Sequence, residues 1–419
     1  MLIGFRLRNY RSFLHEQTFS YCTSADRAHE STHCMPTGMK SVPRLSKSAI
    51  IFGPNGSGKT NFLRALQTLR DMVLHSTAYS ESQFAQRHTP FQLGPSAHRT
   101  TDFEIDLLVR GVRYRYSVSY DAERVWSERL LVYRTGKSQR WFSRRFDAAT
   151  GSETWAPFSP NFNGPREMWR KATHARSLFL TTAALLKSEQ LKPLFHWFEH
   201  CLEIIFPADQ PHAIRMAARS AAGIQNPEIK TQMLQLLRSV DIQVDDVRIA
   251  DDGRTSPAEP PRVEFLHARA GWPPVWLAPE HEAAGTHRLF ALFGLLLSTA
   301  EQGKLLVIDE FDASLHPLVA RSLIRFVNDP AVSAQGAQLL LVSHNTTLMD
   351  LDMLRRDEIW LTELDEALAS TLSTVLRSSP RKHEQIAKCY LRGRYGAIPD
   401  IHPQLLPRSG ERDRAKLAS

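Results

Sequence analysis

Cysteine is scarce in this chain of 419 residues, and its four cysteines are far apart. They are Cys22, Cys34, Cys201 and Cys389, and no two of them form a C-x-x-C pair. Cysteine-based zinc sites and disulfide frameworks need cysteines at close, repeated spacings. We therefore expect reduced thiols, as in a cytoplasm, with neither a zinc site nor a disulfide frame.

Long apolar runs are also missing. The longest, from Leu289 to Leu297, is too short to span a bilayer and has the spacing of a helix core. Near the start of the chain, Arg6, Arg8 and Arg11 interrupt every apolar stretch, so no segment there reads as a signal peptide. The sequence thus predicts a cytoplasmic protein without a membrane segment.

Charge of one sign is in modest excess, with 52 Lys and Arg against 44 Asp and Glu and a formal net charge of +8. This excess of positive charge is compatible with a surface that binds nucleic acid. The sequence has no clear stripe of clustered basic residues, so an ordinary solvated basic surface explains the charge at least as well. Arginine gathers in residues 140–145, which alternate like a strand end, and in the basic tail 402–419, which we expect to be disordered. The charge of the chain therefore neither predicts nor excludes a nucleic-acid partner.

The strongest motif that is present is a glycine-rich loop between an apolar strand, residues 48–52, and a helix that includes residues 61–66. The spacing G-x-x-x-x-G-K-T points successive backbone N–H groups at phosphate oxygens, beside the positive end of the helix. Lys59 is expected to reach the β and γ phosphates of ATP, and the Thr60 hydroxyl to hold Mg²⁺. The predicted nucleotide-binding residues are Gly53, Pro54, Asn55, Gly56, Ser57, Gly58, Lys59, Thr60 and Asn61.

A second motif ends in two carboxylates. Residues 305–308 are the apolar residues of a buried strand, and Asp309 and Glu310 follow them. Ligands bind at the carboxyl ends of strands in open α/β sheets, so both acids are expected beside the phosphates. Asp309 suits a Mg²⁺ contact together with Thr60, and Glu310 suits the general base that orients water. The alternative is a strand that stops at solvated acids.

A third apolar strand, residues 339–342, ends in Ser343 and His344. An imidazole at that edge can hydrogen-bond the γ-phosphate and the attacking water. A structural histidine is the alternative. The position of His344 after the acid pair favours the catalytic role.

The order of patterns predicts that a long insertion splits the ATP-binding sheet. Residues 1–160 are expected to form the N-terminal part of the ATP-binding domain (the head), which contains the glycine-rich phosphate-binding loop (the P-loop) and a β-rich lobe. Within this part, residues 23–43 are predicted to form a loop. Residues 161–240 have helical spacing broken by prolines and predict a compact helical insertion. Residues 241–401 alternate helices and strands and form the C-terminal part of the head. The helical face of the insertion is expected to include Leu191, Leu194, Phe195, Phe198, Leu202 and Ile205.

The three motifs follow one another as in ABC-type ATPase heads, and the chain resembles the heads of SMC and RecF proteins. The opening FRLRNYRSF, residues 5–13, is similar to the N-terminal strand pair of that group. Segments 284–292, 309–317 and 393–399 resemble the prokaryotic stand-alone ATPases of the RloA/AbiL type, relatives of OLD-family ATPases linked to phage defence. The resemblance implies an α/β, ABC-type (SMC/RecF/OLD-like) P-loop head with a β-rich lobe and a compact helical insertion.

The resemblance also implies roles for single residues. Lys59 and Thr60 correspond to the phosphate and Mg²⁺ ligands, Asp309 to the Walker B aspartate, Glu310 to the catalytic base and His344 to the switch histidine.

The segment from Glu282 to Gly285 lies where ABC heads place the signature motif that caps the ATP of a partner subunit. Gly285 and the start of its helix are expected at the γ-phosphate. The usual serine is Ala283 here, so we expect binding in trans through backbone N–H groups and slow hydrolysis. His316 replaces the aspartate of many ABC heads, as in OLD-like relatives. Gln92 is the candidate for the Q-loop, with a polar strand residue as the alternative.

The leading hypothesis is therefore an ATPase that acts as a nucleotide-gated clamp, a homodimer or higher homo-oligomer in anti-phage (abortive infection) defence. OLD nucleases carry a Toprim domain after the ATPase, whereas no nuclease-like acidic triad follows His344. The expected effector is thus a separate protein, such as a Toprim-like nuclease. A scaffold that binds ATP with negligible hydrolysis and a RecF-like DNA-repair head stay open as alternatives. No Asn-Lys-x-Asp motif supports a GTPase.

Overall fold

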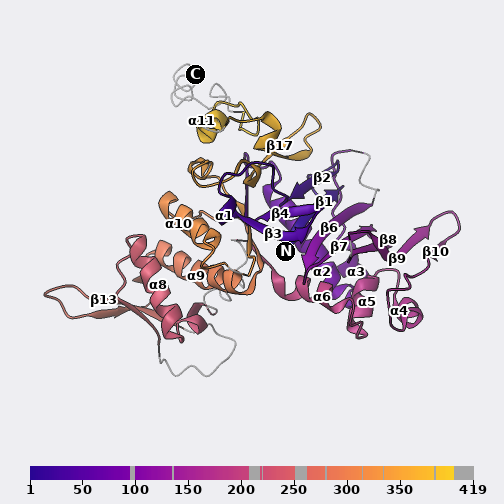
Figure 1. The fold of residues 1–419 in the computed structure, drawn as a ribbon, viewed down its shortest axis with the longest axis horizontal. Helices are drawn as coiled ribbons and strands as arrows, with labels where there is room; N and C mark the ends of the chain where they lie inside the picture. Colours follow the sequence, from indigo (N-terminus) through magenta and orange to yellow (C-terminus); the bar gives the residue numbers. More distant parts are fainter. Residues whose placement is uncertain are drawn as a thin grey trace, which may run out of the picture.

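The computed structural model contains a parallel and an antiparallel β-sheet with the P-loop helix between them (Figure 1). It describes residues 1–94, 100–134, 136–206, 218, 220–250, 262–278, 281–313, 315–333, 335–381 and 384–400. The predicted basic tail, residues 402–419, lies outside the described residues. No helix in the described part is both long and apolar enough to cross a membrane.

The parallel sheet has six strands in the order β11-β15-β16-β5-β17-β18. Every strand pair is parallel except β17 with β18. The strands β5, β15 and β16 are buried along their whole length, which explains why they are continuous apolar runs. The strands are β5 (Ser48–Phe52), β11 (Leu202–Ile205), β15 (Leu305–Ile308), β16 (Gln338–Val342), β17 (Ile359–Leu364) and β18 (Ser370–Thr374).

This sheet unites strands that are far apart in the sequence, as the motif order predicted. Ser48 of β5 lies opposite Leu339 of β16, and Leu305 of β15 lies opposite Gln338. All three strands run in the same direction. The loops that follow Phe52, Ile308 and Val342 therefore meet at one edge.

The antiparallel sheet has seven strands in the order β10-β9-β8-β7-β6-β1-β2. Within it, β1 pairs with β2 as an antiparallel hairpin, and β6 and β7 form a second hairpin across residues 101–120. The strands are β1 (Leu2–Arg8), β2 (Gln17–Ser20), β6 (Thr101–Val109), β7 (Val112–Tyr120), β8 (Val125–Tyr133), β9 (Gln139–Asp147) and β10 (Ser152–Trp155).

Two hydrophobic cores cover the two faces of the parallel sheet. Because successive side chains in a strand point to opposite faces, Ile51 packs in one core and Ile50 in the other. The first core joins the antiparallel sheet to α2 (Lys59–His75), and the second contains α9 (Ala284–Gln302) and α10 (Pro317–Asn328). The P-loop helix is therefore held between the two sheets, and Figure 1 shows α9 and α10 together on the other side of the molecule.

The remaining helical segments are short. They are α1 (Glu30–His33), η1 (Ser76–Ala78), α3 (Glu81–Ala85), α4 (Arg166–Ala172), α5 (Phe179–Leu185), α6 (Lys192–His196), η3 (Trp197–Cys201), α8 (Pro227–Ser239), η5 (Thr346–Leu348), η6 (Arg356–Glu358), η7 (Val375–Ser378) and α11 (Ile386–Leu391).

A buried glutamate ties α5 to the antiparallel sheet. Glu128 of β8 is fully buried and accepts hydrogen bonds from the Tyr116 hydroxyl (2.9 Å) and the Arg144 guanidinium (2.9 Å). It also accepts the backbone N–H groups of Phe179 (2.7 Å) and Leu180 (2.9 Å), at the start of α5. Its charge is thus balanced by Arg144 and placed at the positive end of a helix.

Two sequence expectations are wrong. Residues 23–43 are not only loop, because they contain α1 and most of a hairpin of β3 (Cys34–Met39) and β4 (Val42–Ser46). Leu202 and Ile205 do not extend the helical face of the insertion, because they belong to β11 and lie beside Leu305 and Ile308 of the parallel sheet. A third small sheet, β12 (Asp246–Ile249), β13 (Val263–His267) and β14 (Val275–Leu277), projects from the body in Figure 1.

Candidate functional site

The glycine-rich loop connects β5 to α2, and its backbone conformation requires glycine. Gly53, Gly56 and Gly58 have φ angles of 149°, 78° and 103°. A Cβ atom on Gly53 would lie 2.3 Å from the carbonyl oxygen of Thr362, and one on Gly58 would lie 2.2 Å from the hydroxyl of Ser370. Both contacts are closer than a real Cβ allows, so the loop curls tightly against β17 and β18.

Lys59 lies folded over this loop. Its ammonium donates to the carbonyl oxygens of Gly53 and Pro54, each at 2.8 Å, and its side chain is 5% exposed. Burial lowers the pKa of Lys59 to about 8, against the opposing charges of Asp309 and Glu310. The amine is thus held at the loop by two neutral acceptors, and phosphate oxygens would be stronger partners for it.

Asp309 follows β15 and meets the P-loop directly. The Thr60 hydroxyl donates to Asp309 Oδ2 at 2.7 Å, across 249 residues of sequence. Asp309 is 4% exposed, and its Oδ1 has no hydrogen-bond partner among the described residues. Burial raises the pKa of Asp309, and the Thr60 hydroxyl opposes this shift. A buried carboxylate oxygen without a partner, beside a hydroxyl, fits a hard divalent cation such as Mg²⁺.

Glu310 and His344 complete the edge of the sheet. Glu310 is an exposed non-glycine residue with a φ of 47°, a conformation that concentrates at functional sites. His344 follows β16; burial and then the charge of Lys59 lower its pKa, while Asp312, Glu310 and Asp309 act in the opposite direction. These charges act on one imidazole only because the groups are near one another. The structure therefore brings Lys59, Asp309, Glu310 and His344 together.

Arg288 in α9 also faces this edge, and the sequence reasoning missed it. Its Nε and Nη2 atoms are buried and have no hydrogen-bond partner among the described residues. Burial lowers the pKa of Arg288, and the charge of Glu310 opposes that shift. The signal in the sequence was a cation directly before the apolar run that starts at Leu289.

The predicted signature segment leads into the same helix. The helix α9 starts at Ala284, its cap Ala283 makes no side-chain hydrogen bond, and its first turn has no acidic residue. Gly285 therefore lies among backbone N–H groups at a helix start. Glu282 pairs with His267 of β13, which ties the segment to the projecting sheet.

Three other predicted residues have local partners. Asn61 donates to the Ser12 hydroxyl at 2.9 Å, so its amide supports the loop from the N-terminal sheet. Gln92 donates to the carbonyl oxygen of Pro90 at 3.1 Å. His316 accepts the N–H of Leu318 at 3.3 Å and so caps α10.

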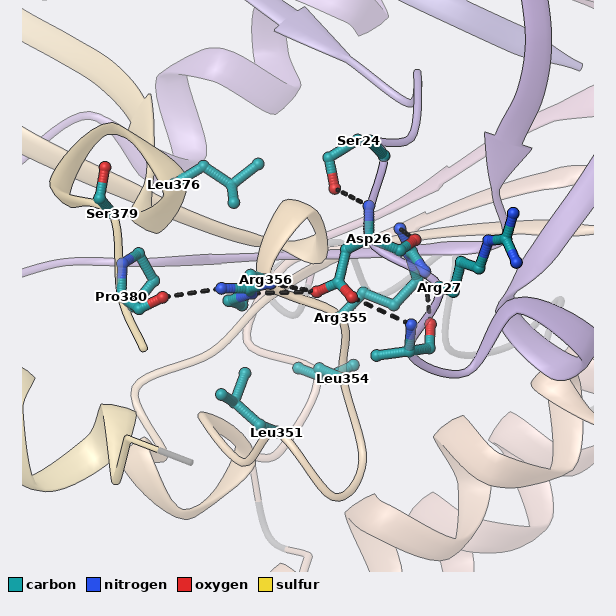
Figure 2. A pocket seen from close by; sticks show the side chains of 12 residues that line it. Ser24, Asp26, Arg27, Leu351, Leu354, Arg355, Arg356, Leu376, Ser379 and Pro380 are labelled. Atoms are coloured by element: carbon teal, nitrogen blue, oxygen red, sulfur yellow. Dashed lines mark hydrogen bonds and ion pairs between the residues drawn. The ribbon is translucent and has the colours of Figure 1, made fainter. Parts of the chain in front are cut away.

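A cavity of about 920 Å³ lies away from the P-loop, at the end of the sheet where β17 begins (Figure 2). Figure 2 shows Arg356 directed at Asp26 and at the carbonyl oxygen of Pro380, the latter at 2.7 Å. Arg355 is buried and binds both carboxylate oxygens of Asp357, at 2.8 and 2.9 Å. These arginines already have partners, so the cavity offers no comparable phosphate cradle.

The family model described as "AAA domain, putative AbiEii toxin, Type IV TA system" matches residues 48–350, more than half of the chain. The matched range begins with β5 and contains the P-loop, Asp309, Glu310 and His344. No curated protein matches the chain.

Solved structures of SMC heads are similar to the fold. The SMC head domain from Thermotoga maritima is 13% identical, with 89% of this chain and 98% of that chain covered and a TM-score of 0.40. The SmcHead bound to the C-winged helix domain of ScpA is 14% identical, with coverages of 89% and 97% and a TM-score of 0.38. A Smc head with an extended coiled coil, bound to the C-terminal domain of ScpA derived from Pyrococcus furiosus, is 13% identical, with coverages of 89% and 96% and a TM-score of 0.36.

The sheet order and the family model together confirm the predicted α/β fold with a P-loop ATPase domain. The β-rich lobe is the seven-stranded sheet.

Proposed function

The chain belongs to the AbiEii-type family of AAA domains, and on that basis we propose that it hydrolyses ATP between two copies and thereby controls a separate effector. The observation that carries the proposal is the hydrogen bond from Thr60 to Asp309 Oδ2, while Asp309 Oδ1 is buried and has no partner within the part of the chain that the structure describes. In P-loop NTPases these two groups hold the cation that bridges the phosphates. Bound here, Mg²⁺ would supply positive charge against the phosphate oxygens.

Lys59 has the next role. Its ammonium leaves the carbonyl oxygens of Gly53 and Pro54 when phosphate oxygens take their place, because a charged acceptor makes the stronger hydrogen bond. The phosphates also favour the protonated amine, whose pKa is about 8 without them.

Glu310 and His344 act on the attacking water. Glu310 lies next to Asp309 and accepts a proton from a water in line with the γ-phosphate. His344 has a lowered pKa, so its imidazole is neutral near pH 7 and can both donate and accept a hydrogen bond. Arg288 has two buried N–H groups, at Nε and Nη2, without a hydrogen-bond partner among the described residues, and it supplies them to the charge that builds up beside Glu310.

A second copy supplies the other wall of the site. The start of α9 has free N–H groups and no acidic side chain, so it suits the γ-phosphate of a partner's ATP. Ala283 offers no hydroxyl there, and hydrolysis is expected to be slow.

The test is Glu310→Gln, which keeps the shape of the side chain but cannot accept the proton. Mass measurement should show a monomer without ATP and a lasting dimer with Mg-ATP. Lys59→Ala is the matched control and should stay monomeric in both conditions. If the mass of Glu310→Gln stays the same with and without ATP although ATP still binds, the proposal that ATP joins two copies is wrong.

Ala283 also supports a second candidate, a scaffold that binds ATP with negligible turnover. Steady-state phosphate release that Glu310→Gln abolishes would exclude the scaffold. The description of the family as a type IV toxin–antitoxin system, together with the resemblance to RloA/AbiL ATPases, supports a role in phage defence. Phage plating on cells that carry the native gene cluster, with Lys59→Ala as the comparison, tests that role; equal plating would exclude it.

A further inference from the structure

A group of metal-ligating side chains lies outside the nucleotide site, where α6 continues into η3. His196, Glu199 and His200 are three and four residues apart, so they share one face of the helix. Their ligand atoms all lie within 4.8 Å of one another. The imidazole centroids of His196 and His200 are 5.3 Å apart, and Nε2 of His200 is 3.0 Å from Oε2 of Glu199.

We propose that His196, Glu199 and His200 form a site for a divalent first-row transition-metal ion such as Zn²⁺. Two imidazoles and one carboxylate are ligands that zinc accepts, and two histidines one turn apart on a helix are a common way to present them. Mg²⁺ prefers oxygen ligands only, so this site and the site at Asp309 select different ions. This proposal departs from the expectation of no zinc site, which rested on the cysteine pattern alone and did not consider histidine ligands.

The backbone that carries these ligands is firmly anchored. Trp197 and Phe198, between the first ligand and the second, are buried in the core. Arg70 of α2 donates to the carbonyl oxygens of Phe198 (2.9 Å) and Glu199 (3.4 Å), which the wider turn of η3 would otherwise leave without partners.

The ligands themselves face outward. The side chains of His200 and Glu199 are 63% and 42% exposed, so an ion can reach them from solvent. Three ligands leave a coordination position for water. The ligands are thus held in place on the backbone side and open on the other, as metal binding requires.

The place of this turn in the fold gives the ion a consequence. Leu202 follows η3 directly and begins β11, which is hydrogen-bonded to β15, the strand that Asp309 follows. Arg70 belongs to the P-loop helix. A metal ion at η3 would therefore stiffen a link between the two elements that hold Thr60 and Asp309. The site itself does not depend on the proposed ATPase function.

The experiment uses the untagged full chain, stripped of metal by a chelator and titrated with ZnCl₂ against a chromophoric competitor. We expect one Zn²⁺ per chain, bound at least about tenfold more weakly by His196→Ala and by His200→Ala, since even outer partners of a ligand are worth tenfold or more. His174→Ala changes another exposed histidine and is the matched control, with unchanged binding. Circular dichroism checks that each variant is folded.

Cobalt gives a second readout. Co²⁺ bound to the chain should show visible absorption that His200→Ala alters and His174→Ala does not. Zinc bound equally by the wild type and both histidine variants, or no zinc bound at millimolar concentration, would overturn the proposal.

Discussion

Replacing Arg288 with methionine should stabilise the nucleotide-free protein while impairing its activity. Two nitrogen donors of this guanidinium, Nε and Nη2, are buried and find no hydrogen-bond partner in the described ranges of the chain. A buried donor without a partner costs about 1–3 kcal/mol. Because Arg288 is only half-buried and its surroundings can relax, we expect a gain of about 1–2 kcal/mol for the pair. Methionine keeps the apolar stem that packs along α9.

The assay is thermal unfolding without nucleotide, followed by ATP turnover. One kcal/mol moves the melting temperature of a large chain by roughly 2 °C, so Arg288→Met should melt about 2–4 °C higher than the wild type. Turnover should fall by about tenfold to a hundredfold, the value of one hydrogen bond to a charged group in the transition state. Arg325→Met, at an exposed arginine on α10, should change neither quantity.

The reasoning fails if Arg288→Met melts below the wild type, because the guanidinium would then have partners that stabilise the folded chain. It also fails if the melting temperature rises and turnover is unchanged, because Arg288 would then have no part in hydrolysis.

Four other predictions concern a buried ion pair and the P-loop. Glu128→Ala removes one of the two carboxylate partners of buried Arg144, the other being Glu153, and it also removes the acceptor of the Tyr116 hydroxyl and of two backbone N–H groups. It should lower the free energy of unfolding by about 3–5 kcal/mol, measured by urea denaturation, and a loss below about 1 kcal/mol would contradict the bonding described. At pH 8.5, Mg-ATP binding should take up a proton, because Lys59 has a pKa of about 8 in the free protein and the phosphates raise it; calorimetry in two buffers of different ionisation enthalpy measures this uptake, and Lys59→Met should abolish it. Without nucleotide, the free energy of unfolding should rise as the pH is raised from 8 toward 10.5, the pKa of Lys59 in the unfolded chain. In that range Lys59 is protonated in the unfolded chain and mostly deprotonated in the folded chain, so raising the pH favours the folded state. Gly58→Ala should lower the melting temperature, because its φ of 103° costs other residues about 1–3 kcal/mol and its Cβ would meet Ser370; an unchanged melting temperature and ATP affinity would contradict this.

The sequence predicted the parts of the site that belong to continuous local patterns. The glycine spacing, the apolar strands and the acids or histidine that end them are each contained in a few residues, so Lys59, Asp309 and His344 could be placed at one edge before any coordinates. Thr60 and Asp309 then meet as expected, although the hydrogen bond between them spans 249 residues.

Other features depend on neighbours that the sequence does not reveal. Leu202 and Ile205 fit the spacing of the preceding helical face, and only pairing with β15 shows that they belong to a strand. The need for a partner at Arg288 depends on burial by other elements. The sequence analysis did not identify the group of His196, Glu199 and His200, because the apolar spacing of residues 191–205 indicated only a buried helical face.

The place of β5 in the parallel sheet has a consequence for synthesis on the ribosome. Its two neighbours, β16 and β17, start at residues 338 and 359, whereas β5 ends at residue 52. At a rate of roughly 10 residues per second, β5 waits on the order of half a minute for the first of them. A nascent chain that stops before residue 338 lacks both, and with them the histidine and the far wall of the loop. We therefore expect a chain truncated before residue 338 not to bind nucleotide.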